Sequence, residues 1–128
     1  MTIVHESEVK EERVPGRFIR WIADETTLQP KHLSSCVIRV VPGETVQPAH
    51  AHPEGEELIY FISGTGQVWI DGEIGDVRPG SVVLFEQGKV HMVRNTCDEE
   101  MKVVCFFAPP TGLANYEMHE DVEFVATR

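Results

Sequence analysis

Short runs of apolar residues, separated by glycine and proline, recur along most of this chain. Runs of roughly four to eight residues that are rich in β-branched and aromatic side chains are typical of strands. No stretch has the 3.6-residue period of a long amphipathic helix. The pattern predicts strands at residues 17–22, 33–41, 47–52, 57–63, 66–71, 81–86, 90–95 and 101–108.

Turn residues fill nearly every gap between these runs. Ser63-Gly64-Thr65-Gly66 and Asp71-Gly72 are typical of tight hairpins, and Arg78-Pro79-Gly80 reverses the chain. Pro15-Gly16 precedes residues 17–22, whose alternation is typical of an edge or dimer-forming strand. Many short strands joined by such turns predict an all-β sandwich or barrel.

The bulk composition limits the classes of protein. The 128 residues are 41% hydrophobic, which is enough for one domain with a packed core. The formal net charge is -10, and because phosphate binding relies on clustered Lys and Arg we expect no nucleic-acid partner. No secretory leader follows Met1, and no apolar run approaches the roughly 20 residues of a membrane helix. We therefore expect a cytoplasmic protein that makes no membrane contact.

The cysteines give no sign of covalent or catalytic chemistry. Cys36, Cys97 and Cys105 are odd in number and lack a Cys-x-x-Cys spacing. This argues against a disulfide framework and against a structural zinc site. Free cysteine commonly packs as a small apolar residue, and we expect buried or half-exposed thiols here.

His50 and His52 are the first candidates for metal chemistry. Residues two apart in an extended strand project to the same face, so both imidazoles can reach one ion. The turn residues 53–56 follow, and Glu57 then begins an apolar run. A carboxylate in that place is costly to bury unless a positive charge meets it, and a divalent cation meets this need.

Strand alternation distinguishes Glu57 from its neighbour Glu56. The period of two places Glu57 on the same face as Ile59 and Phe61, toward the interior. It turns Glu56 to the solvent, together with Glu54 in the preceding loop. Glu57 is therefore the predicted metal ligand of the three.

The residues around this group resemble the first motif of the cupin superfamily. That motif is glycine, a spacer, His-x-His, three or four residues, Glu, six residues and glycine. Gly43, His50, His52, Glu57 and Gly64 match it. The spacer before His50 is six residues long where five is usual.

A second stretch is similar to the second cupin motif. That motif is glycine, five residues, Pro-x-Gly, two residues, His, three residues and Asn. Gly80, Gly88, His91 and Asn95 match in register, while Glu86 stands in the usual proline position. We expect this substitution to alter a turn rather than the metal site. Two motifs in the right order are a stronger indication than one His-x-His.

The resemblance implies a fold and an organisation for the whole chain. A cupin is a jelly-roll barrel, or double-stranded β-helix, and residues 1–128 would form one such domain. Residues 1–15 are expected as a loosely ordered arm, 16–42 as leading strands, 43–95 as the two motifs, and 96–128 as a closing strand and C-terminal tail. Residues 116–124 would return along the outside or close over the mouth of a pocket. The resemblance also implies a homodimer.

The resemblance adds His91 to His50, His52 and Glu57 as the ligands of one divalent transition metal. Three neutral imidazoles and one carboxylate carry a charge of -1, so a divalent ion gives the site a net charge of +1. This mixed nitrogen and oxygen set fits iron, manganese, nickel, cobalt or zinc. A six-coordinate ion would keep two positions open, whereas a structural zinc site closes with four ligands that commonly include cysteine. Asn95 has no evident metal role, and we expect it to satisfy a turn.

The sequence does not identify a catalytic residue. We consider candidates for the pocket wall at Arg39, Gln47, Tyr60, Trp69 and Met92, although strand parity turns Tyr60 to the other face. The larger aromatic residues are expected to fill the core, as is usual in barrels; they are Trp69, Phe61, Phe85, Phe106 and Phe107. The remaining histidines are expected at the surface, and they are His5, His32 and His119.

Two functions fit these observations. The first is a metalloenzyme that acts on a small oxygen-rich organic molecule by dioxygenase, isomerase, decarboxylase or lyase chemistry, and the open metal positions favour it. The second is a non-catalytic module that binds or senses a small ligand through the metal. The absence of a recognisable acid-base pair beside the ligands favours this alternative, and a fold does not imply a function.

Overall fold

A computed structural model describes residues 1–127 of the chain, which are almost entirely strands and loops. The strands are β1 Glu12–Val14, β2 Arg17–Ala23, β3 Ser34–Val40, β4 Ala49–Ala51, β5 Glu56–Ser63, β6 Gly66–Ile70, β7 Glu73–Val77, β8 Val82–Phe85, β9 His91–Asn95, β10 Met101–Ala108 and β11 Glu117–His119. Two short 3-10 helices, η1 Glu6–Glu8 and η2 Leu113–Asn115, complete the elements.

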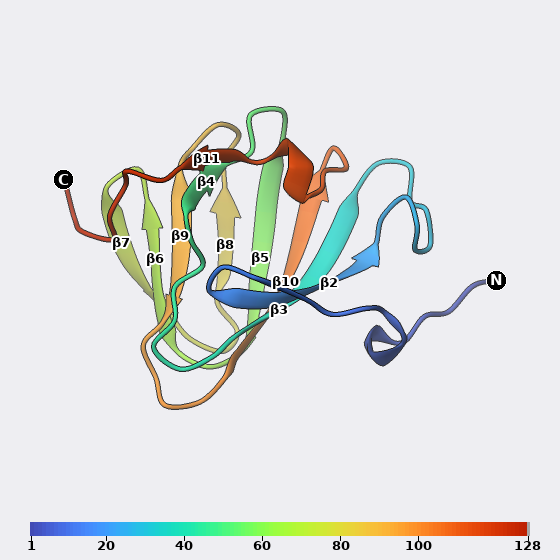
Figure 1. Cartoon of the computed structure of the whole chain (residues 1–128), viewed down its shortest axis with the longest axis horizontal. Helices are drawn as coiled ribbons and strands as arrows, with labels where there is room; N and C mark the ends of the chain where they lie inside the picture. Colours follow the sequence, from blue (N-terminus) through green and yellow to red (C-terminus); the bar gives the residue numbers. More distant parts are fainter. Residues whose placement is uncertain (128) are drawn as a thin grey trace.

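The strands form two antiparallel sheets that face each other (Figure 1). One sheet has the order β1-β2-β3-β10-β5-β8, and the other has the order β11-β4-β9-β6-β7. Strands that are neighbours in a sheet are often distant in the sequence, because the chain crosses between the sheets as a jelly roll requires. The predicted all-β barrel is confirmed.

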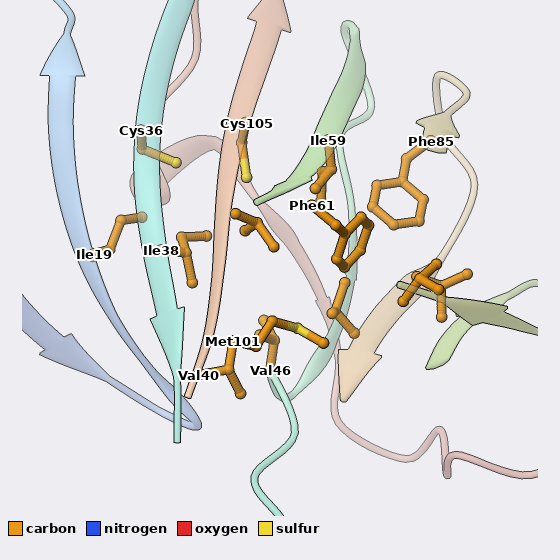
Figure 2. Close-up of a cluster of buried hydrophobic side chains, with 14 of the residues drawn as sticks. Ile19, Cys36, Ile38, Val40, Val46, Ile59, Phe61, Phe85, Met101 and Cys105 are labelled. Carbon is orange, nitrogen blue, oxygen red and sulfur yellow. The ribbon is translucent and has the colours of Figure 1, made fainter. Parts of the chain in front are cut away.

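The core lies between the sheets and follows the alternation of the strands. In β5, Ile59 and Phe61 are buried while Tyr60 is 43% exposed on the outer face. Figure 2 shows Phe61 and Phe85 meeting inside the barrel with residues from β2, β3 and β10. Phe107 is also buried, but Phe106 is 41% exposed, so the expectation that Phe106 fills the core is wrong. Its position in β10 has the outward parity.

Every strand that the apolar pattern predicts is present, within two residues at each end. The Asp71-Gly72 hairpin between β6 and β7 is also confirmed, and both of its turn residues have positive φ. The turn at residues 63–66 is not a hairpin, because it joins β5 in one sheet to β6 in the other. Gly64 is required there, since a Cβ atom would lie 2.7 Å from the Met101 Cα.

The N-terminal strands are arranged differently from the expectation. β2 is not an edge strand, because it pairs with β1 on one side and with β3 on the other. The first 15 residues, expected as a loose arm, contain η1 and the edge strand β1. Lys102 binds Glu6 at 2.6 Å, which holds η1 against the sheet.

The C-terminal segment covers the outer face of the five-stranded sheet. Trp69 and Met92 point outward from β6 and β9 and pack against Val122 and Phe124. The indole of Trp69 donates a hydrogen bond to the backbone oxygen of Val125 at 2.7 Å. In Figure 1 this red segment runs along β4, with which β11 pairs. No helix within residues 1–127 is long and apolar enough to cross a bilayer.

Candidate metal centre

Three strands bring the predicted ligand residues to one place inside the barrel. His50 lies in β4 and is directly opposite His91 in β9, while Glu57 enters from β5 and His52 follows β4. One potential ligand atom from each of the four residues lies within 4.8 Å of the others. Their exposed fractions are only 5% for His50, 4% for His52, 3% for Glu57 and 2% for His91. No other cluster of this kind occurs in the described part of the chain.

Local sequence explains why these side chains turn inward. The alternation of β4 points His50 and His52 into the barrel while Ala49 joins the cluster on the outer face. In β5 the same alternation buries Glu57 and exposes Glu56, as predicted. The carboxylate therefore enters an apolar interior because it shares a strand face with Ile59 and Phe61.

Backbone carbonyl groups orient two of the imidazole rings. His50 Nδ1 lies 3.2 Å from the oxygen of Pro48, and His91 Nδ1 lies 3.1 Å from the oxygen of Lys89. Because a carbonyl oxygen only accepts, each Nδ1 carries the proton and Nε2 retains its lone pair. This arrangement is common for metal-binding histidines, whose second nitrogen is fixed by a hydrogen bond.

The Glu57 carboxylate lies next to the imidazole rings of His52 and His91. Its Oε1 atom accepts a hydrogen bond from His52 Nε2 at 2.8 Å and lies 3.2 Å from His91 Nε2. The His91 atom has no hydrogen-bond geometry to any group, and His52 Nδ1 has no partner either. Buried nitrogen atoms without partners are costly, and a cation beside Glu57 would engage the His91 lone pair.

Burial and these contacts set the protonation of the cluster. Burial lowers the pKa of His50 to about 3, so its imidazole is neutral near pH 7. Burial alone would raise the pKa of Glu57, but the hydrogen bond from His52 and the nearby His91 ring outweigh it and hold that pKa below its ordinary value. A neutral imidazole and an ionised carboxylate are the forms that bind metal.

Aromatic rings enclose the cluster. Phe85 stacks on His91 with ring centroids 3.9 Å apart and planes 3° from parallel. Tyr116 stacks on His50 at 4.8 Å and meets the His52 ring edge-on at 4.5 Å. Two alternatives were expected for residues 116–124, a return along the outside of the barrel or closure over the pocket. Both occur, because β11 returns along the outside and Tyr116 covers the site.

The interior cavity beside the cluster is small and differs from the expected pocket. It has a volume of about 20 Å³, close to the space that one water molecule needs. Its wall consists of His50, Glu57 and His91, apolar core residues, and the side chains of Arg17 and Tyr116. The sequence missed Arg17, although its alternation with Ile19 placed it on the inner face of β2.

The proposed pocket-wall residues lie elsewhere, and this prediction was wrong. Arg39 pairs with Glu11 and Glu100 on the outside, and Gln47 is exposed. Trp69 and Met92 belong to the cluster on the outer face of the five-stranded sheet. Strand parity separates Arg39, Trp69 and Met92 from the cavity, because a neighbouring position on a strand faces the opposite way, whereas Gln47 precedes β4 and lies outside the strands.

The remaining candidates have the roles expected of them. Asn95 is buried, and its amide nitrogen donates to the backbone oxygens of Val40 and Glu99 while its oxygen accepts from the Cys97 nitrogen. It thus holds the turn after β9. His5 and His32 are exposed, and His119 bonds to Glu117 near the surface. All three cysteines are free thiols, with Cys36 and Cys105 buried.

This donor set fits a divalent transition metal. It offers three imidazoles and one carboxylate, it is buried, and it has histidine nitrogens without other partners. Mixed nitrogen and oxygen donors suit several first-row metals. His50, His52, Glu57 and His91 are the residues that could hold the ion.

Comparison with known proteins supports the resemblance seen in the sequence. Protein SchB of Streptomyces halstedii is 31% identical over 107 residues, which cover 84% of this chain and 77% of that protein. Polyketide synthase CurC of Streptomyces cyaneus is 27% identical over 107 residues, covering 84% of this chain and 69% of CurC.

A solved structure and a family model complete the comparison. Polyketide cyclase RemF from Streptomyces resistomycificus has a TM-score of 0.72 and 23% identity, over 84% of this chain and 79% of RemF. That likeness shows the fold alone. The model of the cupin domain matches residues 36–107, more than half of the 128 residues. The chain therefore belongs to the cupin family.

Proposed function

We propose that this chain is a mononuclear divalent-metal enzyme that acts on a small oxygen-rich organic molecule. The observation that carries the proposal is the convergence of four buried donor residues to within 4.8 Å. Ionisable groups are rarely buried together without a counterpart, because each loses its hydration. A divalent ion bound by His50, His52, Glu57 and His91 supplies that counterpart.

The metal is drawn from iron, manganese, nickel, cobalt and zinc, which all accept this donor set. When bound, such an ion would polarise an oxygen atom of the substrate as a Lewis acid. The protein itself contributes the orientation of the imidazoles, which the carbonyl groups of Pro48 and Lys89 hold. It also contributes a water-poor interior, in which electrostatic interactions are strong.

Two further polar groups favour an enzyme over a passive binding module. Tyr116 and Arg17 both line the cavity beside the donor residues. Burial raises the pKa of the Tyr116 hydroxyl, so Tyr116 retains its proton near neutral pH and can donate it in a hydrogen bond. Such a donor would stabilise negative charge that develops on a substrate oxygen during a reaction, which favours an enzyme.

The closed site limits the substrate and its route of entry. The cavity of about 20 Å³ is too small for an organic molecule larger than a few atoms, so Tyr116 must move when the substrate binds. A second pocket of about 150 Å³ reaches His52 from the surface, and its wall includes Pro109 and Asn115. We propose this pocket as the entrance. The names of CurC and RemF refer to polyketides, which are also rich in oxygen.

Turnover of simple probes distinguishes the enzyme from the binding module. We would load the protein with each metal and incubate it with oxalate, acetylacetone or catechol, following conversion by NMR and oxygen uptake with an electrode. Conversion by the wild type, and none by His91→Ala, supports the enzyme. Binding of a probe without conversion for any metal would instead establish the alternative, a metal-dependent binding or sensing module.

We further propose that the chain forms a homodimer through the outer face of the six-stranded sheet. Six apolar side chains are between 40% and 57% exposed on β5, β8 and β10; they are Leu58, Tyr60, Ile62, Val82, Leu84 and Phe106. They are contiguous, since Leu58 is opposite both Leu84 and Phe106. Exposed apolar patches of this kind commonly mark an interface. Light scattering of wild type and Leu84→Arg tests it: we expect a dimer for the former and a monomer for the latter.

A further inference from the structure

Arg17 is a buried cation inside the barrel. It begins β2 and is only 6% exposed. The preceding Pro15-Gly16 turn packs closely on Thr45, since a Cβ atom on Gly16 would lie 1.7 Å from the Thr45 backbone oxygen. This packing directs Arg17 inward. The side chain lines the same cavity as His50, Glu57, His91 and Tyr116.

The guanidinium of Arg17 is largely without partners. Its Nη1 atom donates to the backbone oxygen of Pro15 at 3.0 Å, and its buried Nε atom has no partner. Among residues 1–127, no carboxylate oxygen lies within salt-bridge distance of it; Glu57, the acidic residue of the cavity, is bonded to His52 instead. An arginine offers five N–H donors in a planar fork, so most of this capacity is unused.

The charge of the site requires an anion. The inference rests on the proposed function, in which a divalent metal joins Glu57 and three neutral histidines. A charge of +2 from the metal, -1 from Glu57 and +1 from Arg17 leaves +2 inside an otherwise apolar barrel. A buried charge of this size is costly unless a ligand of opposite charge accompanies it.

We propose that Arg17 is the anion-binding residue of the site, and that the ligand is a small organic acid. The carboxylate oxygens of the anion would accept hydrogen bonds from Arg17, while the remainder of the molecule faces the four donor residues. Arginine suits this role because its planar fork matches the geometry of a carboxylate. Arg17 thus determines specificity by selecting an anion over a neutral molecule of the same shape.

Formate and formamide test this directly, because they have nearly the same size and shape but differ in charge. We would titrate each into the Co(II)-loaded protein by calorimetry and visible absorption. Wild type is expected to bind formate, with formamide at least about tenfold weaker. Arg17→Met should lose about tenfold or more in formate affinity, and Arg17→Lys should fall between. Arg39→Met is the matched control, and its affinity should equal that of wild type.

Two measurements separate this role from a structural one. The cobalt content of Arg17→Met should equal that of wild type, and its midpoint of thermal unfolding should be equal or higher, because an unpaired buried charge has been removed. Equal formate affinity in wild type and Arg17→Met, or equal affinity for formamide, overturns the proposal while the metal function stands.

Failure of the proposed metal function gives a different pattern. If the protein takes up no cobalt, the formate titration is made on the metal-free protein. Weak formate binding that Arg17→Met abolishes then supports the anion site independently, and formate binding that is the same in both proteins refutes it.

Discussion

Two groups of charged residues in this molecule follow opposite rules. On the outer surface, Arg39 binds Glu11 at 2.7 Å and Glu100 at 2.7 Å, and Glu11 also binds Arg20. Each positive group there has a negative partner, and water reaches all of them. Inside the barrel, Arg17 has no carboxylate partner, and the donor residues around Glu57 leave two histidine nitrogens without hydrogen bonds.

This difference in charge pairing indicates that the buried group, and not the surface network, is the binding site. The outer network can form and break with little consequence, since exposed ion pairs contribute little to stability. The inner group is costly for the folded chain by itself and becomes favourable only when something binds. Substitutions in the two groups should therefore have different effects: those in the inner group on binding, and those in the outer network on stability.

The largest effect is expected from Glu57→Gln. The substitution keeps the size of the side chain but removes the only carboxylate of the donor group, so metal affinity should fall about 100-fold or more. Metal content is measured by mass spectrometry after dialysis against a competing chelator. Glu56→Gln, one residue earlier and exposed, is the matched control and should keep its metal. Equal loss in both variants would mean that general charge, rather than the inner group, holds the ion.

Tyr116→Ala should open the inner group to the solvent. The loss of a half-buried aromatic side chain that stacks on His50 should destabilise the protein by about 2 kcal/mol. A chelator should also extract the metal faster than from wild type. Tyr116→Phe keeps the stacking and should release metal at the wild-type rate. If the alanine variant releases metal no faster, Tyr116 does not close the site.

Arg39→Met tests the outer network. Arg39 makes two ion pairs and lies 4.1 Å from the centroid of the Phe18 ring, so its removal should lower the free energy of unfolding by about 1 kcal/mol. Denaturant unfolding measures the change, with Arg39→Lys as a smaller perturbation. This loss contrasts with the neutral or stabilising effect expected for Arg17→Met. A reversal of the two results would refute the comparison.

The smallest effect concerns Glu11 and pH. The hydrogen bond from Arg39 holds the pKa of Glu11 below its ordinary value of 4.5. A carboxyl whose pKa is lower in the folded state contributes stability above the unfolded pKa, and loses it as the pH falls through the folded pKa. Glu11→Gln should therefore cost about 0.5 kcal/mol at pH 7, and the two proteins should converge once the pH has fallen below the lowered pKa of folded Glu11. A difference that persists at low pH would contradict this origin.

Much of the fold and the donor group was predictable because both depend on local alternation. The period of two placed Glu57, Ile59 and Phe61 on the inner face correctly and turned Tyr60 outward. The polar strands β1, β7 and β11 were missed, since they lie at or next to sheet edges and bury few side chains.

The cavity wall was harder to predict because it depends on packing between distant segments. Arg17 shares the inward parity of Ile19, but only the packing of the Pro15-Gly16 turn on Thr45 brings it to the cavity. Tyr116 reaches His50 because β11 pairs with β4, a contact between residues more than 60 positions apart. The candidates Trp69 and Met92 are buried, but on the other side of their sheet. Apolar character alone does not distinguish two buried faces.

Anomalous X-ray diffraction from crystals of the metal-loaded protein, recorded at the absorption edge of the ion, tests the proposed metal centre most directly. We expect one anomalous peak per chain, about 2.0–2.3 Å from donor atoms of His50, His52, Glu57 and His91. A peak anywhere else, or no peak at this site in protein that retains one ion per chain, would contradict it.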